Sequence, residues 1–323
     1  MKNNMLIKAI EQANSIAVAG HIRPDGDCVG STMGLYLYVK KYYPEKEITV
    51  YLEEIPDTLH FMQETDKIVH EAHPDKVYDL FVALDCGDLG RLGFAKNMFE
   101  RANKTLCVDH HISNQVFAME NHIRPDASST SELVYNLLDK SKITCHIAEC
   151  LYTGMVHDTG IFRYSCTHPS TMRAAADLME KGINHTEIIT KTFDEKTYAQ
   201  NKILGYALMK SRLLMDGKCI VSFLTKQEMV EYQVSTKDLE GIVSLMKMTT
   251  GTDVSMFAYE LEEGCFKFSL RSSENVDVSE VARCFGGGGH VRASGCTLEG
   301  PMEELIDKLI EKIALQLNDG GEV

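Results

Sequence analysis

The sequence has few of the features that mark membrane, secreted or disordered proteins. Its 323 residues include no tryptophan, which excludes nothing, and only seven prolines and 23 glycines, too few for long disordered linkers. No segment approaches the roughly 18–20 consecutive apolar residues that a membrane span needs. The N-terminal stretch MKNNMLIKAIE lacks the apolar region of a signal peptide. We therefore expect a globular, cytoplasmic protein without a membrane partner.

Patterns that would indicate disulfides or binding to long polyanions are also missing. The ten cysteines include no Cys-x-x-Cys pair, which predicts reduced, buried residues and no disulfide framework. Lysine and arginine number 33 against 47 aspartates and glutamates, so the formal net charge is −14. This balance disfavours a protein that coats long nucleic acid. It allows a small anionic substrate, because metal ions and a few arginines can make a positive pocket on an acidic protein.

The first half of the sequence alternates between strand and helix patterns. Apolar runs of strand length cover Ser15–Gly20, Ile48–Leu52, Leu80–Asp85 and Thr105–Asp109. Helical spacing is found over Gly30–Tyr42, Gly90–Ala102, Ser129–Lys140, His146–Val156 and Pro169–Lys181. Strands that are apolar on both faces and are joined by helices predict an α/β fold with a doubly wound, mainly parallel sheet.

The second half predicts a smaller α/β domain. Because Ile188–Leu214 is mainly helical and polar, we expect a first domain over residues 1–187, a helical linker over 188–214 and a second domain over 215–323. Strands are expected there near Cys219–Leu224, Val254–Leu261 and Cys265–Ser272, and helices near Leu239–Met248, Val278–Phe285 and after Pro301.

Acids and histidines follow three of the predicted strands. They are His21, Asp25 and Asp27 in HIRPDGDCVGS, Asp85 in ALDCGD, and Asp109, His110 and His111 in CVDHH. Asp158, in HDTGIF, is expected in the turn after a helix. Ligands of doubly wound sheets bind beyond the carboxyl ends of the strands. Each residue alone would commonly be a turn former or a helix N-cap, but independent turn formers have no reason to recur at three strand ends.

Six of these side chains form a candidate metal-ligand set without a thiolate: His21, Asp25, Asp27, Asp85, His110 and Asp158. Four converging carboxylates repel one another unless cations lie between them. Such ligands favour Mn²⁺ or Mg²⁺, with Fe²⁺ a further candidate, over structural zinc. Six ligands suit two ions that share a bridging carboxylate and lie roughly 3.5–4 Å apart, as in phosphoryl-transfer sites.

A second conspicuous stretch is FGGGGHVRASG, residues 285–295. Consecutive glycines let backbone N–H groups approach an anion or a base closely, and His290 and Arg292 add side-chain donors. A flexible hinge or a helix C-terminus is the alternative interpretation. The stretch lacks the strand–loop–helix context of a dinucleotide-binding fingerprint. Arg271, in SLRSS, ends a predicted strand and is an ordinary surface arginine or a substrate contact.

Taken together, these motifs resemble those of the DHH phosphoesterase superfamily. The resemblance rests on HIRPDGDCVGS, ALDCGD, VDHHISN and GMVHDTGIFRY, and GGGGHVRASG resembles the signature of the DHHA1 domain. The motifs cover nearly the whole chain in the right order. Length and layout resemble the group of NrnA-like oligoribonucleases and 3′-phosphoadenosine-5′-phosphate (pAp) phosphatases.

The resemblance implies a role for each candidate residue. His21 and Asp25 would bind a first metal ion, Asp27, His110 and Asp158 a second, and Asp85 would bridge both. His111 would bind the substrate phosphate or protonate the leaving oxygen, oriented by Asp109. Nucleotide contacts would come from Arg271, Ser272, Gly287, Gly288, Gly289 and His290, with Arg91 as a weaker candidate. Ser129 and Ser131 are interpreted mainly as helix caps.

The activity implied is that of a two-metal, Mn²⁺-dependent phosphoesterase. It would hydrolyse short RNA or DNA oligonucleotides and linear dinucleotides such as pApA to mononucleotides and dephosphorylate pAp. A cyclic di-AMP phosphodiesterase would use the same metals, whereas an inorganic pyrophosphatase would need a basic C-terminal cluster that is missing here. A non-catalytic nucleotide sensor should have lost ligands, and all six positions are filled. A homodimer is compatible with these expectations.

Overall fold

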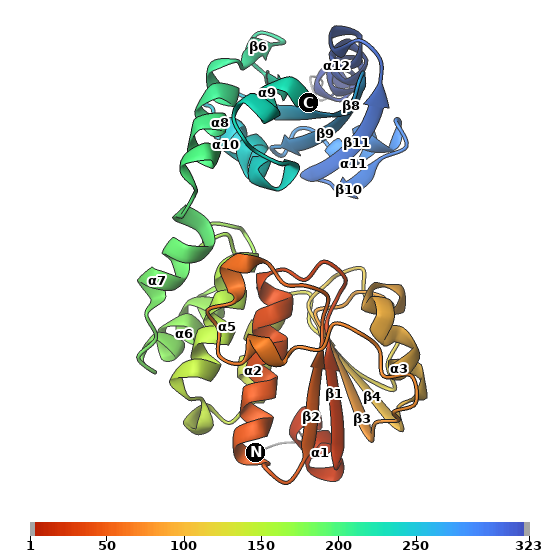
Figure 1. The fold of residues 1–323 in the computed structure, drawn as a ribbon, viewed down its shortest axis with the longest axis vertical. Helices are drawn as coiled ribbons and strands as arrows, with labels where there is room; N and C mark the ends of the chain where they lie inside the picture. Colours follow the sequence, from red (N-terminus) through yellow and green to blue (C-terminus); the bar gives the residue numbers. More distant parts are fainter. Residues whose placement is uncertain (1–3, 320–323) are drawn as a thin grey trace. The chain divides into compact units, whose positions relative to one another are not determined.

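The computed structural model describes residues 4–319. The chain divides into two compact units, Met1–Glu195 and Lys196–Val323 (Figure 1). The residues expected to form a separate linker are shared between them. Helix α7 (His185–Ile189) lies in the first unit, whereas α8 (Tyr198–Met209) buries Ile203 and Ala207 in a core of the second.

The first unit is built on a parallel sheet of five strands in the order β2-β1-β3-β4-β5. The strands are β1 (Ser15–Ala19), β2 (Glu47–Tyr51), β3 (Leu80–Leu84), β4 (Lys104–Asp109) and β5 (Glu120–Ile123). The first four are the predicted ones, and the order is that of a doubly wound fold. The sheet order reverses beside β1, so the crevice for a ligand lies at the carboxyl ends of β1 and β3.

Helices cover both faces of this sheet, because successive side chains of a strand point to opposite faces. On one face Ile16 and Val18 join a core with α1 (Met5–Gln12), α2 (Gly26–Tyr42), α4 (Thr130–Leu137), α5 (Cys145–Asp158) and α6 (Pro169–Met179). On the other face Ala17 and Ala19 pack toward α3 (Lys96–Arg101). Figure 1 shows α2 and α5 on one side of the strands and α3 on the other.

Close packing of α2 against α5 depends on small residues. A Cβ atom on Gly30 of α2 would overlap the carbonyl oxygen of Cys150 and backbone atoms of Gly154 in α5. The two helices therefore meet backbone to backbone, and the start of α2 is held close to the end of α5. Asp27 and Asp158 come from these two helix ends, so the packing helps to bring them together.

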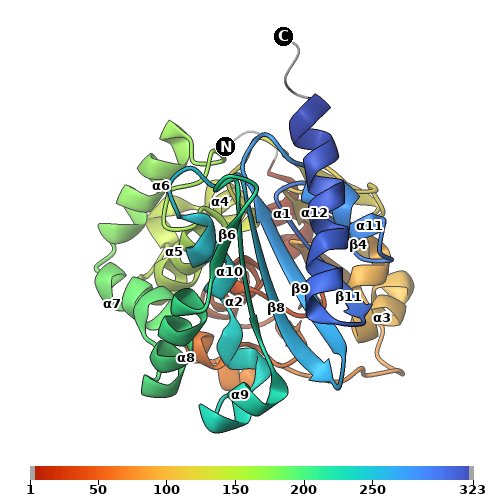
Figure 2. The same ribbon diagram turned by 90° about the horizontal axis from the view of Figure 1, so that it is seen from above.

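The second unit contains a mixed sheet of six strands in the order β10-β11-β9-β8-β7-β6. The strands are β6 (Arg212–Leu214), β7 (Cys219–Leu224), β8 (Val254–Glu262), β9 (Cys265–Ser272), β10 (Gly288–His290) and β11 (Ala293–Glu299). Only the β7–β8 pair is parallel. One face packs on α11 (Val278–Arg283) and α12 (Met302–Asp319), and the other on α8, α9 (Lys226–Glu231) and α10 (Ile242–Lys247). Figure 2 shows α12 beside β9 and β11.

Several predicted boundaries were wrong. Helix α2 begins at Gly26, four residues before the predicted start, because Asp25 caps it. The expected helix over Gly90–Ala102 is a 3₁₀ segment (Leu89–Ala95) followed by α3. The segment 188–214, expected to be helical, contains the strand β6. Strand β5 was not predicted. Within residues 4–319, no helix is both long and apolar enough to cross a membrane.

Candidate metal centre

The stretch that follows β1 supplies the first three candidate ligands. The imidazole of His21 has its Nδ1 atom 2.8 Å from the carbonyl oxygen of Ile22, which leaves Nε2 directed at Asp25 and Asp85. One oxygen of Asp25 accepts from the backbone N–H groups of Asp27 (3.0 Å) and Cys28 (3.1 Å) and so caps α2. Asp25 is therefore the helix cap of the alternative interpretation, and it is still a candidate ligand because the same oxygen lies 3.7 Å from His21 Nε2.

The carboxylate of Asp27 is held by the first turn of α4. It is buried and accepts from the backbone N–H groups of Thr130 (2.6 Å) and Ser131 (2.9 Å). The hydroxyl of Thr130 donates to Asp85 (3.1 Å), so the same turn holds a second acid. A Cβ atom on Gly154 would overlap both Ser131 Oγ and an Asp27 oxygen. The role of Thr130 was missed, because no sequence spacing relates it to Asp27.

The helix-capping interpretation is right for one serine and wrong for the other. Ser129 caps α4 by accepting from the N–H of Glu132 (3.0 Å). Ser131 lies inside the helix, and its buried hydroxyl has no hydrogen-bond partner within residues 4–319. Its contribution is the backbone N–H that binds Asp27.

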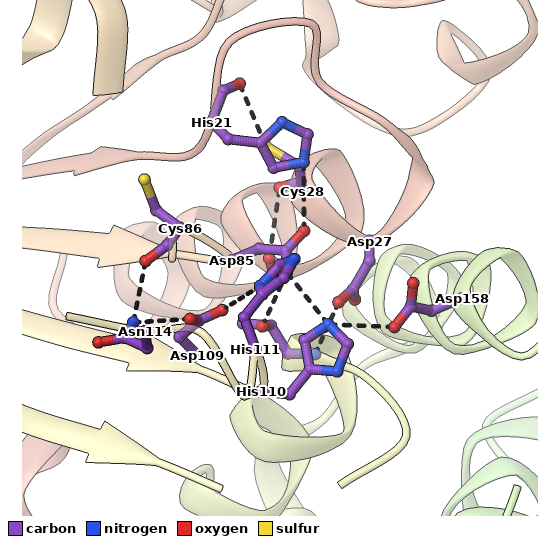
Figure 3. A network of polar contacts seen from close by, with 12 residues as sticks. His21, Asp27, Cys28, Asp85, Cys86, Asp109, His110, His111, Asn114 and Asp158 are labelled. Carbon is purple, nitrogen blue, oxygen red and sulfur yellow. Dashed lines mark hydrogen bonds and ion pairs between the residues drawn. The ribbon is translucent and has the colours of Figure 1, made fainter. Parts of the chain in front are cut away.

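Asp85 lies at the centre of the cluster and has an unusual backbone conformation. Its φ is +56°, in the left-handed region that few non-glycine residues adopt, and its side chain is buried. One oxygen is 3.4 Å from His21 Nε2 and the other 3.5 Å from His110 Nε2 (Figure 3). Strained backbone of this kind is concentrated at functional sites. The conformation places one carboxylate between two histidines from different strand ends.

His110 and Asp158 complete the cluster. His110 Nε2 is 3.2 Å from an Asp158 oxygen, and Asp158 is the last residue of α5 rather than part of the following turn. Three sets of candidate ligand atoms each lie within 4.8 Å of one another. They are His21–Asp25–Asp85, Asp27–His110–Asp158 and Asp85–His110–His111.

The protonation of these groups reflects the crowding of negative charge. Burial, together with repulsion by Asp85, raises the pKa of Asp27 well above its usual range, and burial raises the pKa of Asp158 to about 7. Burial disfavours the charged imidazole of His21, but Asp25 and Asp85 outweigh this and raise its pKa to about 10. Protons on the histidines thus balance the acids, and cations held by the same oxygen and nitrogen atoms would do so instead. The donor set fits hard or borderline divalent ions such as Mn²⁺.

His111, a member of the third set, is also part of a hydrogen-bonded chain that runs through Asp109. Its Nδ1 atom is 2.7 Å from an oxygen of the fully buried Asp109. Asn114 donates to the other oxygen of Asp109 (2.6 Å) and to the carbonyl of Cys86 (3.1 Å). The hydrogen bond to Asp109 raises the pKa of His111. The arrangement fixes Nδ1 as a donor to Asp109 and leaves Nε2 to meet a substrate. Asn114 was missed although it ends the motif VDHHISN, because only the acids and histidines of that motif were considered as candidates.

Comparison with known families agrees with this geometry. The model of the DHH family, N-terminal domain, matches residues 15–155, and the DHHA1 domain matches residues 216–319. The chain belongs to the DHH/DHHA1 phosphoesterase superfamily.

Relatives of this DHH/DHHA1 protein align over nearly its full length. It is 29% identical to the bifunctional oligoribonuclease and PAP phosphatase NrnA of Thermus thermophilus, with 98% of this chain and 94% of the relative covered. It is 26% identical to the protein of the same name from Bacillus subtilis, with 91% and 92% covered. The structure of an exopolyphosphatase-related protein from Bacteroides fragilis matches with a TM-score of 0.90 and 28% identity, covering 98% of this chain and 96% of that one.

The predicted substrate residues of the DHHA1 domain lie at one edge of its sheet. Gly288, Gly289 and His290 form β10, an edge strand paired with β11. Gly286 and Gly287 end α11 by donating to the carbonyls of Arg283 and Ala282, so the helix-C-terminus interpretation is right for them, whereas Gly288 and Gly289 belong to a β-hairpin. A Cβ atom on Gly287 would overlap backbone atoms of β11, so a side chain would not fit there. His290 is exposed.

Arg271 and Ser272 lie at the end of β9, close to the same hairpin. Arg271 pairs with Ala293 of β11, and its guanidinium donates to the carbonyl of Leu270 (2.9 Å). The hydroxyl of Ser272 donates to the carbonyl of Val276 (2.6 Å), which closes the turn after β9. Arg91 is instead in the DHH domain, where its carbonyl accepts from Ile22 (2.8 Å) and supports the loop that carries His21.

Proposed function

We propose that this protein is a two-metal phosphoesterase that cleaves short oligonucleotides to mononucleotides and dephosphorylates pAp. The observation that carries the proposal is the pair of ligand sets, His21–Asp25–Asp85 and Asp27–His110–Asp158, built around a strained, buried Asp85. The names of the relatives from Thermus thermophilus and Bacillus subtilis support the same pair of substrates.

The first ligand set would hold one cation and the second set another, with Asp85 contacting both. Two such cations would supply an activated water nucleophile and neutralise charge on the phosphoryl oxygens. We propose Mn²⁺ because the set mixes carboxylate oxygens with imidazoles and has no thiolate. The α4 turn holds the carboxylates of Asp27 and Asp85, which would orient them for the ions.

His111 would act on the substrate itself. Asp109 fixes its Nδ1–H, and the same hydrogen bond raises the pKa of His111, which favours a second proton on Nε2. As the bond from phosphorus to the leaving oxygen breaks, this proton would pass to that oxygen, which lowers the barrier by general acid catalysis. Asp109 and Asn114 are positioning residues in this scheme, since they act through His111.

The hairpin edge of the DHHA1 domain would bind the nucleotide. Gly287–Gly289, Arg271, Ser272 and His290 would contact phosphate or base, with Arg91 as an additional contact in the DHH domain. The N–H of Gly287 and the hydroxyl of Ser272, which donate to the carbonyls of Ala282 and Val276, would have to exchange partners when the nucleotide binds. A chain with a net charge of −14 gives no general attraction to long nucleic acid, so we expect the rate to fall with oligonucleotide length.

A substrate panel tests this function. The full chain, stripped by chelator and reloaded with Mn²⁺ or Mg²⁺, is assayed on pAp, pApA, a five-residue RNA, cyclic di-AMP, pyrophosphate and short polyphosphate, and the metal content is counted. We expect two ions per chain and turnover of the first three substrates. Preference for cyclic di-AMP or for polyphosphate would replace the proposed substrate class. Tight nucleotide binding without turnover would indicate a sensor.

A further inference from the structure

A histidine that is absent from the ligand sets lies directly against the metal loop, the segment Asp25–Asp27 at the start of α2. The imidazole of His157, on α5, occupies the space where a side chain of Gly26 would be. A Cβ atom on Gly26 would overlap three ring atoms of His157, namely Cγ, Nδ1 and Cδ2. Gly26 is the residue between Asp25 and Asp27, which belong to different ligand sets. The ring of His157 therefore supports the backbone that separates two candidate ligands.

Hydrogen bonding does not explain this histidine. Its Nε2 atom is buried and has no hydrogen-bond partner within residues 4–319. A buried polar atom without a partner opposes folding, so a purely structural filler would be better served by an apolar ring. What the side chain does contribute here is the ring itself, packed between two other groups.

The second group is Phe193. Its ring centroid lies 4.8 Å from that of His157, with an angle of 51° between the rings. Phe193 belongs to a π-helical turn, Thr190–Asp194, that ends one residue before the last residue of the first unit. Single π-helical turns are rare and are frequent at functional sites. The three residues Gly26, His157 and Phe193 thus form a continuous stack from the metal loop to the segment that leads to the second unit.

We propose that His157 is a positioning residue that transmits the placement of the 190–194 turn to the metal ligands Asp25 and Asp27. Movement of Phe193 would shift the His157 ring, and the ring would shift Gly26 and with it one ligand of each set. Metal affinity would then depend on how the chain is held at the end of the first unit. This proposal rests on the two-metal site proposed above.

Mn²⁺ titration calorimetry of the full, chelator-stripped chain tests the stack. His157→Ala removes the ring and should weaken Mn²⁺ binding by about tenfold or more, the usual effect of losing support for a ligand. His157→Phe keeps a ring and should stay within about threefold of the wild type, which also controls for misfolding. Phe193→Ala should weaken binding in the same direction. The double variant His157→Ala/Phe193→Ala should be no worse than His157→Ala, because both act through one contact.

Phe61 offers the matched control. Like Phe193, it packs against the core formed by α2 and α5. Its ring centroid lies 5.7 Å from the Nζ atom of Lys191, which belongs to the same π-helical turn as Phe193. Phe61→Ala should leave Mn²⁺ affinity unchanged. An equal loss in Phe61→Ala and Phe193→Ala, or multiplying losses in the double variant, would overturn the proposal. So would unchanged binding in His157→Ala. A wild type that binds no Mn²⁺ at all would contradict the proposed function. A wild type that binds Mn²⁺ as tightly as His157→Ala would contradict only the role of His157.

A reciprocal substitution tests direct contact. Gly26→Ala places a methyl group against the His157 ring and should reduce Mn²⁺ affinity more than any other variant in the series. Adding His157→Ala removes the obstructing ring, so Gly26→Ala/His157→Ala should bind Mn²⁺ more tightly than Gly26→Ala alone. A double variant that binds more weakly than Gly26→Ala would contradict the stack.

Discussion

The two predicted binding regions of the molecule are prepared for their ligands in opposite ways. In the DHH domain three acids are buried and already oriented: Asp27 by two N–H groups, Asp85 by a hydroxyl, and Asp109 by an amide. In the DHHA1 domain the strand β10 is exposed, and Ser272 is occupied by a local backbone contact. The first region has the preorganisation that charge-dense metal sites need. The second offers mainly backbone groups along a sheet edge, which suit recognition of a substrate more than chemistry.

Breaking the metal centre should produce the largest effect. We expect Asp85→Asn to lower kcat by about 10³-fold or more, since the carboxylate proposed to bridge the two ions is lost and metal catalysis supplies several kcal/mol. Asparagine tolerates a positive φ, so the fold and the melting temperature should change little. Turnover of pAp and pApA under saturating Mn²⁺ measures the effect. Full activity in this variant would refute the bridging role.

Disturbing the orienting chain should cost less and should leave the metals bound. Asp109→Asn removes the negative charge and turns one of the two acceptor oxygens into an NH2 donor, so the side chain can no longer accept from both His111 and Asn114. We expect kcat to fall by roughly 10²- to 10³-fold with Mn²⁺ affinity unchanged. The measurement is kcat alongside metal content. A variant that loses metal as well as activity would show that Asp109 supports the ligand His110 and not the acid His111.

Acidification should weaken metal binding. His21 and His110, with pKa values of about 10, hold protons in the metal-free fold, and Asp158, with a pKa of about 7, loses its proton between pH 6 and 8. The raised pKa of Asp27 acts in the same direction. Mn²⁺ must displace these protons, so affinity rises with pH and falls as pH drops. We expect a change of about tenfold or more per pH unit between pH 6 and 8. Titrations in buffers of different ionisation enthalpy should report proton release, and a flat profile would contradict the charge balance inferred for the site.

Changes at the DHHA1 edge should act on substrate binding alone. Arg271→Ala and His290→Ala are expected to raise KM for pApA by roughly tenfold, the effect of losing a charged hydrogen bond, with kcat and Mn²⁺ affinity nearly unchanged. A fall in kcat with constant KM would mean that this edge contributes to the reaction step, and the contrast between the two regions would then fail.

The smallest effect should come from the support of Asp85. Thr130→Val removes the hydroxyl that donates to Asp85 and is expected to weaken Mn²⁺ binding by up to about tenfold. Thr130→Ser keeps the hydroxyl and should behave like the wild type. Ser129→Ala removes only the helix cap, so it should cost about 1 kcal/mol of stability without affecting Mn²⁺ affinity. Equal metal affinity in Thr130→Val and Thr130→Ser would exclude the hydroxyl as a support.

Much of the fold was accessible from sequence because its signals are local. Four of the parallel strands are continuous apolar runs, and the six candidate ligands follow strand or helix ends where a doubly wound sheet concentrates them. Strand β5 escaped because Glu120–Ile123 is an edge strand of polar and half-buried residues with no apolar run. The support of Asp27 by Thr130, and of Gly26 by His157, joins residues more than 100 positions apart and depends on how the helices pack.

The left-handed backbone at Asp85 also limits how such a protein can change over generations. At φ = +56° glycine, asparagine and aspartate are the least strained residues, whereas a branched apolar residue is strained more. A descendant that gave up catalysis but kept the fold would therefore be expected to carry glycine or asparagine at this position. Among relatives that keep the same strands and helices, this one substitution would therefore distinguish members without catalytic activity from active ones.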